Sequence, residues 1–562
     1  MIKKNKLNSE QTQISTLVKK ATAYHQQGNF EEAQFIYEQI LSSQPNHFDV
    51  LQLLGVLFAQ TKKYSQAIEF LSKAIDVNSN HAGVFNNRGI ALKELKRFEE
   101  ALASYDQAIM IKRDHLDVYN NRGNVLQELK RLDEALVSYD QAIAIKPDYF
   151  EAYYNRGNVL KELKRLDEAL VSYDQAIAIK PDYFEAYYNR GNVLQELKRL
   201  DEALVSYDQA IAIKPDYVQA LSNRGNILQK LKRLDDARAS YNMAIIIDPE
   251  FVDAHWNLSL CNLRMGNFSD GWQGYKWRLK IDGAFGKPLK SNMPNWDFKK
   301  TNKRLLLSTE QGVGDIIFFG RFLSELQKNI PNLLVQIDKR LVSILQRSLP
   351  QIKFYPADID VPESSYDIHS PIASLGEYFN HSKINFLKSK NHYLISDKKR
   401  TKDIRDDLSI NNKLLCGISW KSQSPLTGHE KSLSLEKLAS VFNSEKIRLV
   451  NLQYGETEKD INFLRSKSDI ELIQYSSVDN FNDLDGLASL IDACDFIVTV
   501  DNVTIQISAA LGKESFVLLT HFPHYFWPLE KKESIIFPDL KIYRQEKINY
   551  WDDALEKLKG DL

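Results

Sequence analysis

The segment that decides the fold of the first half is residues 150–183, which begins Phe150-Glu-Ala-Tyr-Tyr-Asn-Arg-Gly-Asn-Val-Leu160. It recurs almost letter for letter at residues 184–217, which sets a repeat period of 34 residues. The same frame runs from residue 14 to about residue 280 and defines eight repeats. Positions within a repeat are numbered here from 1 to 34, with Phe150 at position 1.

Small and aromatic residues recur at fixed positions of this frame. Positions 8 and 20 are small throughout, which lets the two helices of one repeat approach closely. Rings at position 24 then fill the space between the helices, and only the second repeat departs from this, with Leu71. These residues are Ala21, Gly55, Gly89, Gly123, Gly157, Gly191, Gly225 and Ser259 at position 8; Ala33, Ala67, Ala101, Ala135, Ala169, Ala203, Ala237 and Gly271 at position 20; and Tyr37, Tyr105, Tyr139, Tyr173, Tyr207, Tyr241 and Tyr275 at position 24.

Prolines at position 32 (Pro45, Pro147, Pro181, Pro215 and Pro249) lack an amide donor and help to end the second helix. Together these positions resemble the tetratricopeptide repeat. The resemblance implies antiparallel helix pairs without strands over residues 14–280, stacked into an α-solenoid with a long concave surface. Such a surface is suited to binding a peptide or a protein.

Asparagines form a ladder along the repeats. They stand at position 6 as Asn87, Asn121, Asn155, Asn189, Asn223 and Asn257, and at position 9 as Asn124, Asn158, Asn192 and Asn226. An amide offers both a donor and an acceptor, which matches the backbone of an extended peptide. Tetratricopeptide superhelices that feed protein O-glycosyltransferases carry a similar ladder, so we predict a peptide-binding groove lined by the position-6 residues. The alternative is that these amides are repeat consensus and bond only neighbouring backbone.

The bulk composition narrows the classes of function. A chain of 562 residues should divide into about three or four domains of ordinary size. Its net charge of −1 provides no electrostatic footprint for nucleic acid or an anionic membrane. The three cysteines are far apart and lack metal-ligand spacing, so we expect neither disulfides nor a metal site. With no apolar stretch of about 18 residues, we expect a soluble, cytoplasmic protein.

The pattern changes after the repeats. A polar stretch at residues 281–302 is interpreted as a linker, and from Lys303 short apolar runs alternate with helical segments, which is typical of a parallel α/β sheet. A break near residue 400 predicts two doubly wound lobes, 303–400 and 401–562, with a ligand site at the carboxyl ends of the strands. The expected strands are Leu305–Ser308, Leu333–Ile337, Ile352–Tyr355, Tyr366–His369, Leu414–Trp420, Arg448–Gln453, Glu471–Tyr475, Phe496–Val500 and Ser515–Leu519.

Two strand-loop-helix segments stand out. In the first, the strand ending at Ser308 is followed by Gly312-Val-Gly-Asp315, whose aspartate lies at the N-terminus of a new helix. In the second, the strand Phe496–Val500 leads through a polar turn at residues 501–504 into a small-residue helix whose N-terminus can hold a diphosphate.

With Gly417-Ile-Ser-Trp420, Asn451-Leu-Gln453 and Leu487-Ala-Ser-Leu-Ile491, these segments resemble the family 9 glycosyltransferases, which include the lipopolysaccharide heptosyltransferases. Bacterial tetratricopeptide proteins with a fused domain of this kind are the better match. The resemblance covers about residues 300–545 and implies a GT-B fold of two Rossmann-like lobes, with the acceptor on the first lobe and a nucleotide-sugar on the second. It also implies inversion at the anomeric carbon, no metal, and no cofactor, since the nucleotide-sugar is a substrate.

The resemblance assigns roles residue by residue. Asp315 takes the place of the proposed general base, although its helix N-terminus predicts a lowered pKa. The implied donor-binding residues are Gly312, Gly314, Lys431, Asp501, Asn502, Thr504 and Gln506, with Lys421 as the second choice for the basic residue. Gln506 stands where the family usually has His. We predict that the residue 501–504 turn and Lys431 converge on one crevice opposite Gly312–Asp315. Surface or packing roles are expected for His429, His521 and His524, and the aromatic loop 521–527 either stacks on a base or wedges the lobes together.

The leading hypothesis is a glycosyltransferase that moves a sugar from a nucleotide donor to a hydroxyl on a protein or glycan recruited by the repeats. One alternative is a protein O-N-acetylglucosaminyltransferase-type enzyme, although its catalytic portion is considerably longer than the ~260 residues left here, judged against ordinary domain sizes. Another is a non-catalytic scaffold for protein–protein interaction, which Gln506 favours.

Overall fold

The computed structural model describes residues 2–281, 289–380, 392–410, 412–424, 427–525, 527, 529, 537 and 539–562, with side chains from residue 11 onward. Part of the expected linker, residues 282–288, lies outside this set. The chain divides into two compact bodies, residues 1–220 (the first body) and residues 221–562 (the second body), and each is described by itself.

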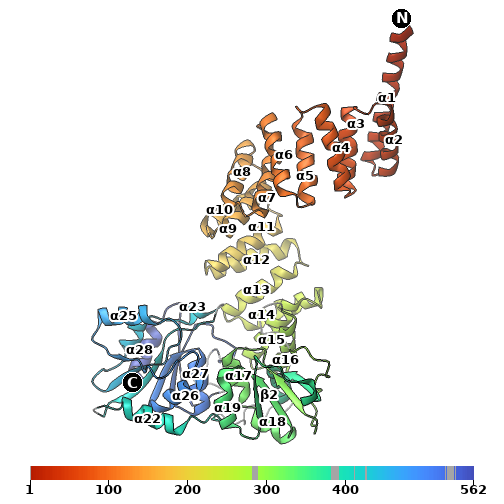
Figure 1. Ribbon diagram of the computed structural model, residues 1–562. Helices are drawn as coiled ribbons and strands as arrows, with labels where there is room; N and C mark the ends of the chain where they lie inside the picture. The colour runs from red at the N-terminus through yellow and green to blue at the C-terminus, as the bar shows by residue number, and fades with distance from the viewer. Residues whose placement is uncertain are drawn as a thin grey trace. The chain divides into compact units, whose positions relative to one another are not determined.

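Helix pairs fill the repeat region of both bodies, and no described residue between 14 and 280 lies in a strand (Figure 1), as the repeat frame predicts. The helices in the first body are α1 (Ile2–Gln26), α2 (Phe30–Ser43), α3 (Phe48–Gln60), α4 (Tyr64–Val77), α5 (Ala82–Glu94), α6 (Phe98–Ile111), α7 (Leu116–Glu128), α8 (Leu132–Ile145), α9 (Phe150–Glu162), α10 (Leu166–Ile179), α11 (Phe184–Glu196) and α12 (Leu200–Ile213). Helix α13 (Val218–Lys230) spans the boundary, and α14 (Leu234–Ile247), α15 (Val252–Arg264), α16 (Phe268–Gly274) and the 3-10 helix η1 (Tyr275–Lys280) belong to the second body.

The predicted packing of small residues against rings is confirmed. A Cβ added at Gly123 would lie 2.6 Å from the Tyr139 ring, and one at Gly157 would lie 2.7 Å from the Tyr173 ring. Both rings are fully buried. Glycine is therefore needed in these two repeats because the ring of the second helix occupies the space of a side chain, whereas the first and last repeats have Ala21 and Ser259 at position 8.

Position 15, where the first helix of each repeat ends, has left-handed backbone. The first and last repeats place Gly28 and Gly266 there, whereas the six inner repeats use lysines with φ between 57° and 61°, which are Lys62, Lys96, Lys130, Lys164, Lys198 and Lys232. Because a side chain is strained in this region, these lysines persist only where the surrounding helix pair fixes the turn.

The first lobe is a parallel sheet in the order β3-β2-β1-β4. Its strands are β1 (Leu305–Ser308), β2 (Leu333–Ile337), β3 (Lys353–Pro356) and β4 (Ile368–Pro371), and its helices are α17 (Val313–Gly320), α18 (Leu323–Asn329), α19 (Val342–Ser348) and α20 (Leu375–Asn380). The first two strands lie where the sequence predicts them, and the other two start one or two residues later than expected.

The second lobe is a parallel sheet in the order β10-β9-β8-β5-β6-β7, which read in reverse is the 3-2-1-4-5-6 order of a Rossmann sheet. Its strands are β5 (Leu414–Ser419), β6 (Ile447–Asn451), β7 (Leu472–Ile473), β8 (Phe496–Val500), β9 (Ser515–Leu519) and β10 (Leu540–Arg544). Its helices are α22 (Lys398–Leu408), α23 (Gly428–Lys431), α24 (Leu435–Ala439), α25 (Glu458–Lys467), α26 (Leu484–Ala493), α27 (Val503–Leu511) and α28 (Asp552–Asp561).

One strand of this sheet was not predicted. Strand β10 was not expected, because its residues Leu540-Lys-Ile-Tyr-Arg544 alternate in polarity at the edge of the sheet. The predicted break near residue 400 lies within α22, which packs on α26 of the second lobe. Its N-cap is Asp397, which accepts hydrogen bonds from the backbone of Lys399 and Arg400.

One apolar core joins the end of the repeats to both sheets. It includes Trp272 and Tyr275 from the last repeat, Leu305 of β1 and Ile497 of β8. Among the described residues, no helix is both long enough and apolar enough to cross a bilayer. The three cysteines, Cys261, Cys416 and Cys494, are buried and free.

Candidate functional site

A cavity of about 410 Å³ opens at the carboxyl ends of β1, β5, β6 and β8. Its first-lobe wall is the Gly312–Asp315 turn, and its second-lobe wall includes Lys431 and residues 501–503. Helices α17 and α27, which start at these two walls, pack against one another (Figure 1). The structure therefore brings together the two segments that the sequence singled out, at the point where the strand order of the second lobe reverses between β5 and β8.

An ion pair between Lys431 and Asp501 lies in the second-lobe wall, with 2.7 Å between Lys431 Nζ and Asp501 Oδ2. Only 15% of the lysine side chain and 9% of the aspartate side chain are exposed. Burial acts to raise the pKa of Asp501, but the charge and the hydrogen bond of Lys431 outweigh burial and hold that pKa below its usual value. Burial, together with the charge of Lys431, lowers the pKa of His524 to about 3, so this imidazole is neutral.

Asp315 behaves differently from the sequence prediction. Burial raises its pKa to about 7, with Glu310 and Asp501 adding to the rise and Lys431 opposing it. The predicted lowering by the helix N-terminus is wrong, because the hydrogen bond to the backbone of Gly312 is a smaller effect than the loss of water around the carboxyl group. A carboxylate with this pKa is a competent proton acceptor near neutral pH.

The remaining predicted donor residues divide into two kinds. Asn502 is fully used within the protein: its Oδ1 caps α27 by accepting from Thr504 N at 3.0 Å, and its Nδ2 donates to Ser419 Oγ at 2.7 Å and to Lys421 O at 3.0 Å. Thr504 Oγ1 and Gln506 Oε1, in contrast, are buried without a hydrogen-bond partner among the described residues. Of these three residues, Asn502 and Gln506 line the cavity, whereas Thr504 does not.

The two glycines of the first-lobe wall have no packing requirement of their own. A Cβ on Gly312 would approach only Asp315 Oδ2, and one on Gly314 only Gln506 Cγ, each at an ordinary 3.7 Å. Neither residue has positive φ. Their effect is to leave backbone uncovered at the cavity.

An aromatic part of the cavity wall, called here the aromatic end, was not predicted. Tyr454, which follows β6, lies with its ring centroid 6.4 Å from that of Phe481, and the guanidinium of Arg340 lies 5.0 Å from the Phe481 centroid. Asn480 donates through Nδ2 to the carbonyls of Asn451 and Gln453, which fixes Oδ1 as a buried acceptor without a partner among the described residues. Two of these residues were within reach of sequence reasoning, since Tyr454 and Asn480 follow predicted strands.

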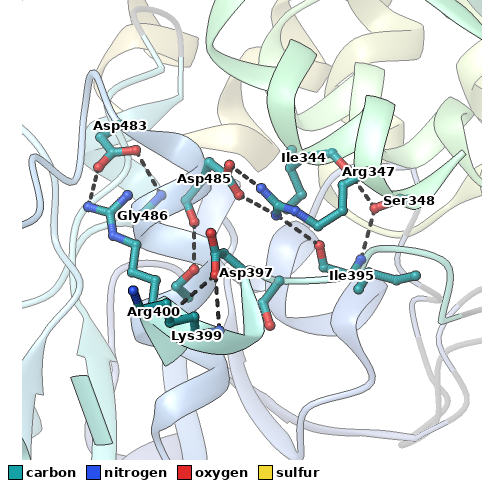
Figure 2. A network of polar contacts seen from close by, with 12 residues as sticks. Ile344, Arg347, Ser348, Ile395, Asp397, Lys399, Arg400, Asp483, Asp485 and Gly486 are labelled. Carbon is teal, nitrogen blue, oxygen red and sulfur yellow. Dashed lines mark hydrogen bonds and ion pairs between the residues drawn. The ribbon is translucent and has the colours of Figure 1, made fainter. Parts of the chain in front are cut away.

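A polar network holds this aromatic end between the lobes (Figure 2). Arg347 of α19 donates to both carboxylate oxygens of Asp485 in the first turn of α26, at 2.7 and 2.5 Å. Beside it, Asp483 caps α26 through Gly486 N and accepts from Arg400 Nη2 at 2.5 Å. Ser348 Oγ accepts from Ile395 N, where the chain enters the second lobe. The network fixes the segment that carries Asn480 and Phe481 relative to the first lobe.

Among the other residues considered in the sequence analysis, His524 lines the cavity, whereas Lys421 and His429 do not. Lys421 pairs with Asp460 at 2.5 Å and does not line it. His429 is largely exposed, as expected, whereas His524 does line the cavity. The loop 521–525 packs against the end of the repeats: Phe522 stacks with Arg264, and Tyr525 Oη lies 2.8 Å from Tyr275 Oη. Among the described residues, no group of three or more His, Cys, Asp or Glu side chains could hold a metal ion.

The asparagine ladder is partly engaged with itself. Nδ2 of Asn121 donates to Asn86 Oδ1 of the preceding repeat, and Nδ2 of Asn155 donates to Asn120 Oδ1. Nδ2 of Asn189 donates to Tyr154 Oη and to Asn158 Oδ1. The partners are side chains rather than the backbone that the alternative reading expected. Asn87, Asn121, Asn155 and Asn189 are half-buried in the first body, and Asn223 and Asn257 are half-buried on α13 and α15.

The position-9 asparagines have a clear structural role. Their Oδ1 atoms accept from the buried position-24 tyrosines: Asn124 from Tyr139 at 2.7 Å, and Asn158 from Tyr173 at 2.8 Å. Asn192 and Asn226 accept from Tyr207 and Tyr241 in the same way.

Comparisons with known proteins establish the repeats. Residues 91–130, 123–164 and 157–198 match a family described as TPR repeat, and residues 184–217 and 218–251 match the tetratricopeptide repeat. Residues 26–108 match the family of anaphase-promoting complex, cyclosome, subunit 3. Residues 26–251 are therefore covered by repeat-type matches, and tetratricopeptide repeats form this part of the chain.

A curated relative is Protein FlbA of Caulobacter vibrioides, 22% identical over 326 residues, which cover 53% of this chain and 52% of FlbA. The chain thus spans about half the length of that relative. Similar solved structures include YrrB, titled a TPR protein with an unusual peptide-binding site (26% identity, TM-score 0.30, 33% of this chain and 95% of that chain). Another is the C-terminal part of a TPR repeat-containing protein from Cytophaga hutchinsonii (16% identity, TM-score 0.38, 43% of this chain and 99% of that chain).

Proposed function

We propose that the second body is a glycosyltransferase of the GT-B type, which transfers a sugar from a nucleotide-sugar to a hydroxyl with inversion. The observation that carries the proposal is the shared cavity. It joins the carboxyl ends of two parallel sheets and has the N-terminus of α27, a buried lysine and a carboxylate on its walls. Helix N-termini and a buried cation bind diphosphate, and a carboxylate opposite them can receive a proton.

The aromatic end suggests how the donor lies. The second-lobe wall includes Asp501 and the start of α27 after β8, Lys431, and Tyr454 and Phe481 after β6 and β7. In our proposal the diphosphate lies at the charged end and the nucleobase at the aromatic end, where rings provide stacking surface. Asn480 Oδ1, fixed as an acceptor by its two carbonyl partners, would take a base N–H.

In the proposed step, the acceptor hydroxyl oxygen attacks the anomeric carbon as the bond from that carbon to the phosphate oxygen breaks. The hydroxyl proton passes to the Asp315 carboxylate, and the nucleoside diphosphate leaves with the bonding electron pair. Lys431 and the α27 N-terminus stabilise the charge on that leaving group, so the step as proposed needs no metal. The pKa of Asp315, about 7, suits it to accept this proton.

The repeats have a separate proposed role, which is to recruit the acceptor. Tetratricopeptide repeats expose an extended surface built from the first helices of successive repeats. The position-6 asparagines are half-buried on those helices. Because several Nδ2 donors already bond a neighbouring side chain, we propose that the carbonyl oxygens, rather than the amide hydrogens, meet a bound peptide.

The test of donor binding is a thermal-shift panel of nucleoside diphosphates and nucleotide-sugars on the full chain. A ligand at about 100 times its Kd stabilises the folded state by about 2.7 kcal/mol, so the correct nucleotide should raise the unfolding temperature of the second body measurably. Lys431→Ala should reduce the shift by half or more at the same ligand concentration, and Lys421→Ala should not. No shift with any nucleotide would refute the proposal.

A non-catalytic scaffold is the second candidate, and two observations favour it. Gln506 replaces the histidine of the resembling family, and the charge of Lys431 is already paired with Asp501. A phosphate must therefore compete with a carboxylate for this lysine. The scaffold predicts peptide binding by the repeats with no nucleotide binding at all, which the same panel distinguishes.

A further inference from the structure

The last repeat packs against both lobes. The Trp272 ring contacts Phe319 of α17, with 5.9 Å between ring centroids, and any Cβ added at Gly376 of α20 would overlap Trp272. On the other side, Tyr275 Oη meets Tyr525 Oη of the second lobe at 2.8 Å. Trp272, Tyr275 and Tyr525 are each at most 7% exposed. Residues 252–280 therefore form part of the core beneath the cavity as well as the end of the repeat frame.

A fully buried ion pair links this repeat to the turn that carries Asp315. Arg278 of η1 donates to Glu310 Oε1 from Nη2 at 2.7 Å and from Nε at 3.1 Å. It also donates from Nη1 to Tyr275 O at 3.0 Å, which anchors the guanidinium to its own helix. The side chains of Arg278 and Glu310 are 1% and 0% exposed.

The location of this pair is unusual for a purely structural contact. Burying two charges costs several kcal/mol per ion, and a well-packed apolar pair would stabilise the fold as well. Glu310 precedes the Gly312–Asp315 turn by two residues, and its charge acts on Asp315 alongside the charges of Lys431 and Asp501. Burial raises the pKa values of Tyr275 and Tyr525, and the charge of nearby Asp315 adds to the rise.

We propose that the last repeat completes the functional site, with Arg278 as a positioning residue that fixes Glu310 and, through it, the Gly312–Asp315 turn. The repeats and the lobes are then one functional assembly rather than a binding module joined to an independent enzyme. The positioning claim concerns the turn itself, and only its consequence for turnover rests on the proposed transferase function.

The test uses the full chain in three variants: Arg278→Lys, the double variant Arg278→Met/Glu310→Gln, and the control Arg304→Met. The double variant removes both charges, so that neither is left buried without its partner. The control removes the exposed Arg304–Asp367 ion pair, which lies in the first lobe like Glu310. Hydrogen exchange of the segment 309–320 reports the turn directly, with β1 and residues 499–512 as internal references. We expect exchange protection of the turn to fall by about tenfold in the double variant and less in Arg278→Lys, with both references and the control unchanged.

Two results would overturn the positioning role. One is a turn as well protected in the double variant as in the wild type. The other is protection lost throughout the second body of the double variant while Arg278→Lys matches the wild type, which would make Arg278 a general stabilising residue. Once a donor is known, kcat should fall about tenfold or more while KM for the nucleotide-sugar changes little. If the wild-type chain binds no nucleotide, the proposed transferase function is refuted, but the hydrogen-exchange test of the positioning role remains valid.

Discussion

The repeats of the first body pair most of their buried polar side chains with one another, whereas the lobes of the second body leave several buried polar atoms unpaired around one cavity. In the repeats, each position-9 asparagine accepts from a buried tyrosine, and Arg122, Arg156 and Arg190 each bond an aspartate and a serine. Around the cavity of the lobes, Thr504 Oγ1, Gln506 Oε1, Asn480 Oδ1 and Glu310 Oε2 have no partner among the described residues. Because unpaired buried polar groups are costly, their concentration at one place indicates a site built for something other than stability.

Substitution of Asp315 should have the largest effect on turnover, and its outcome distinguishes an enzyme from a scaffold. Asp315→Asn keeps the shape of the side chain but cannot accept a proton, so transfer should fall by about a hundredfold or more while nucleotide affinity stays the same. Turnover is measured as nucleoside diphosphate release with a working acceptor. Near wild-type turnover would falsify the general-base role and reduce Asp315 to a residue of the helix start.

The second effect concerns the cation of the charged end. Lys431→Ala should weaken nucleoside diphosphate binding by roughly tenfold to a hundredfold, the range expected for one charge-assisted hydrogen bond of about 1.5–3 kcal/mol. Lys431→Ala leaves the Asp501 carboxylate buried without its cation. The double variant Lys431→Ala/Asp501→Asn avoids this and is therefore the cleaner measurement by calorimetry. Lys421→Ala is the matched control, since that lysine pairs with Asp460 outside the cavity. Equal affinities in all three variants would exclude Lys431 from the phosphate site.

The elements of the fold were largely predictable, and the chemistry of the site was not. Continuous apolar runs such as Leu333–Ile337 and Ser515–Leu519 gave strand limits that the structure reproduces, because central parallel strands are buried on both faces. The polar turns after β1 and β8 could be predicted to face one crevice, because each follows the carboxyl end of a strand in its own sheet. The pKa of Asp315 could not, since it depends on burial of the carboxyl group and on the charges of Lys431 and Asp501 from the second lobe.

The third effect is a pH dependence of stability. The folded pKa of Asp315, about 7, exceeds the unfolded value of about 3.9, so the carboxyl group favours the folded state below pH 4 and progressively less as pH rises to 7. Asn lacks this titration. The unfolding temperature of Asp315→Asn should match the wild type near pH 4 and exceed it increasingly up to about pH 7, then run parallel to it. A constant difference across this range would show that burial does not raise the pKa.

The smallest effect lies in the repeats, where the third repeat lacks the position-9 asparagine of the four repeats that follow it. Ile90 stands at position 9 of the third repeat, and Tyr105 Oη is correspondingly buried without a partner among the described residues. Arg88 Nε of the same repeat is likewise unpaired, because Ser72 stands where the next repeats have aspartate. In this repeat, the buried tyrosine lacks the hydrogen bond that a position-9 asparagine provides in the next four repeats.

Exchanging the two position-9 residues measures that contribution. Asn124→Ile removes the acceptor of Tyr139 and should destabilise the first body by about 1–3 kcal/mol, the cost of an unsatisfied buried hydroxyl. Ile90→Asn gives Tyr105 an acceptor and should stabilise by at most about 1 kcal/mol, since the half-buried isoleucine loses apolar contact in return. Denaturant unfolding followed by circular dichroism reports both. If Asn124→Ile is as stable as the wild type, the tyrosine–asparagine bond has no net effect, and the position-9 ladder must be retained for binding rather than for the fold.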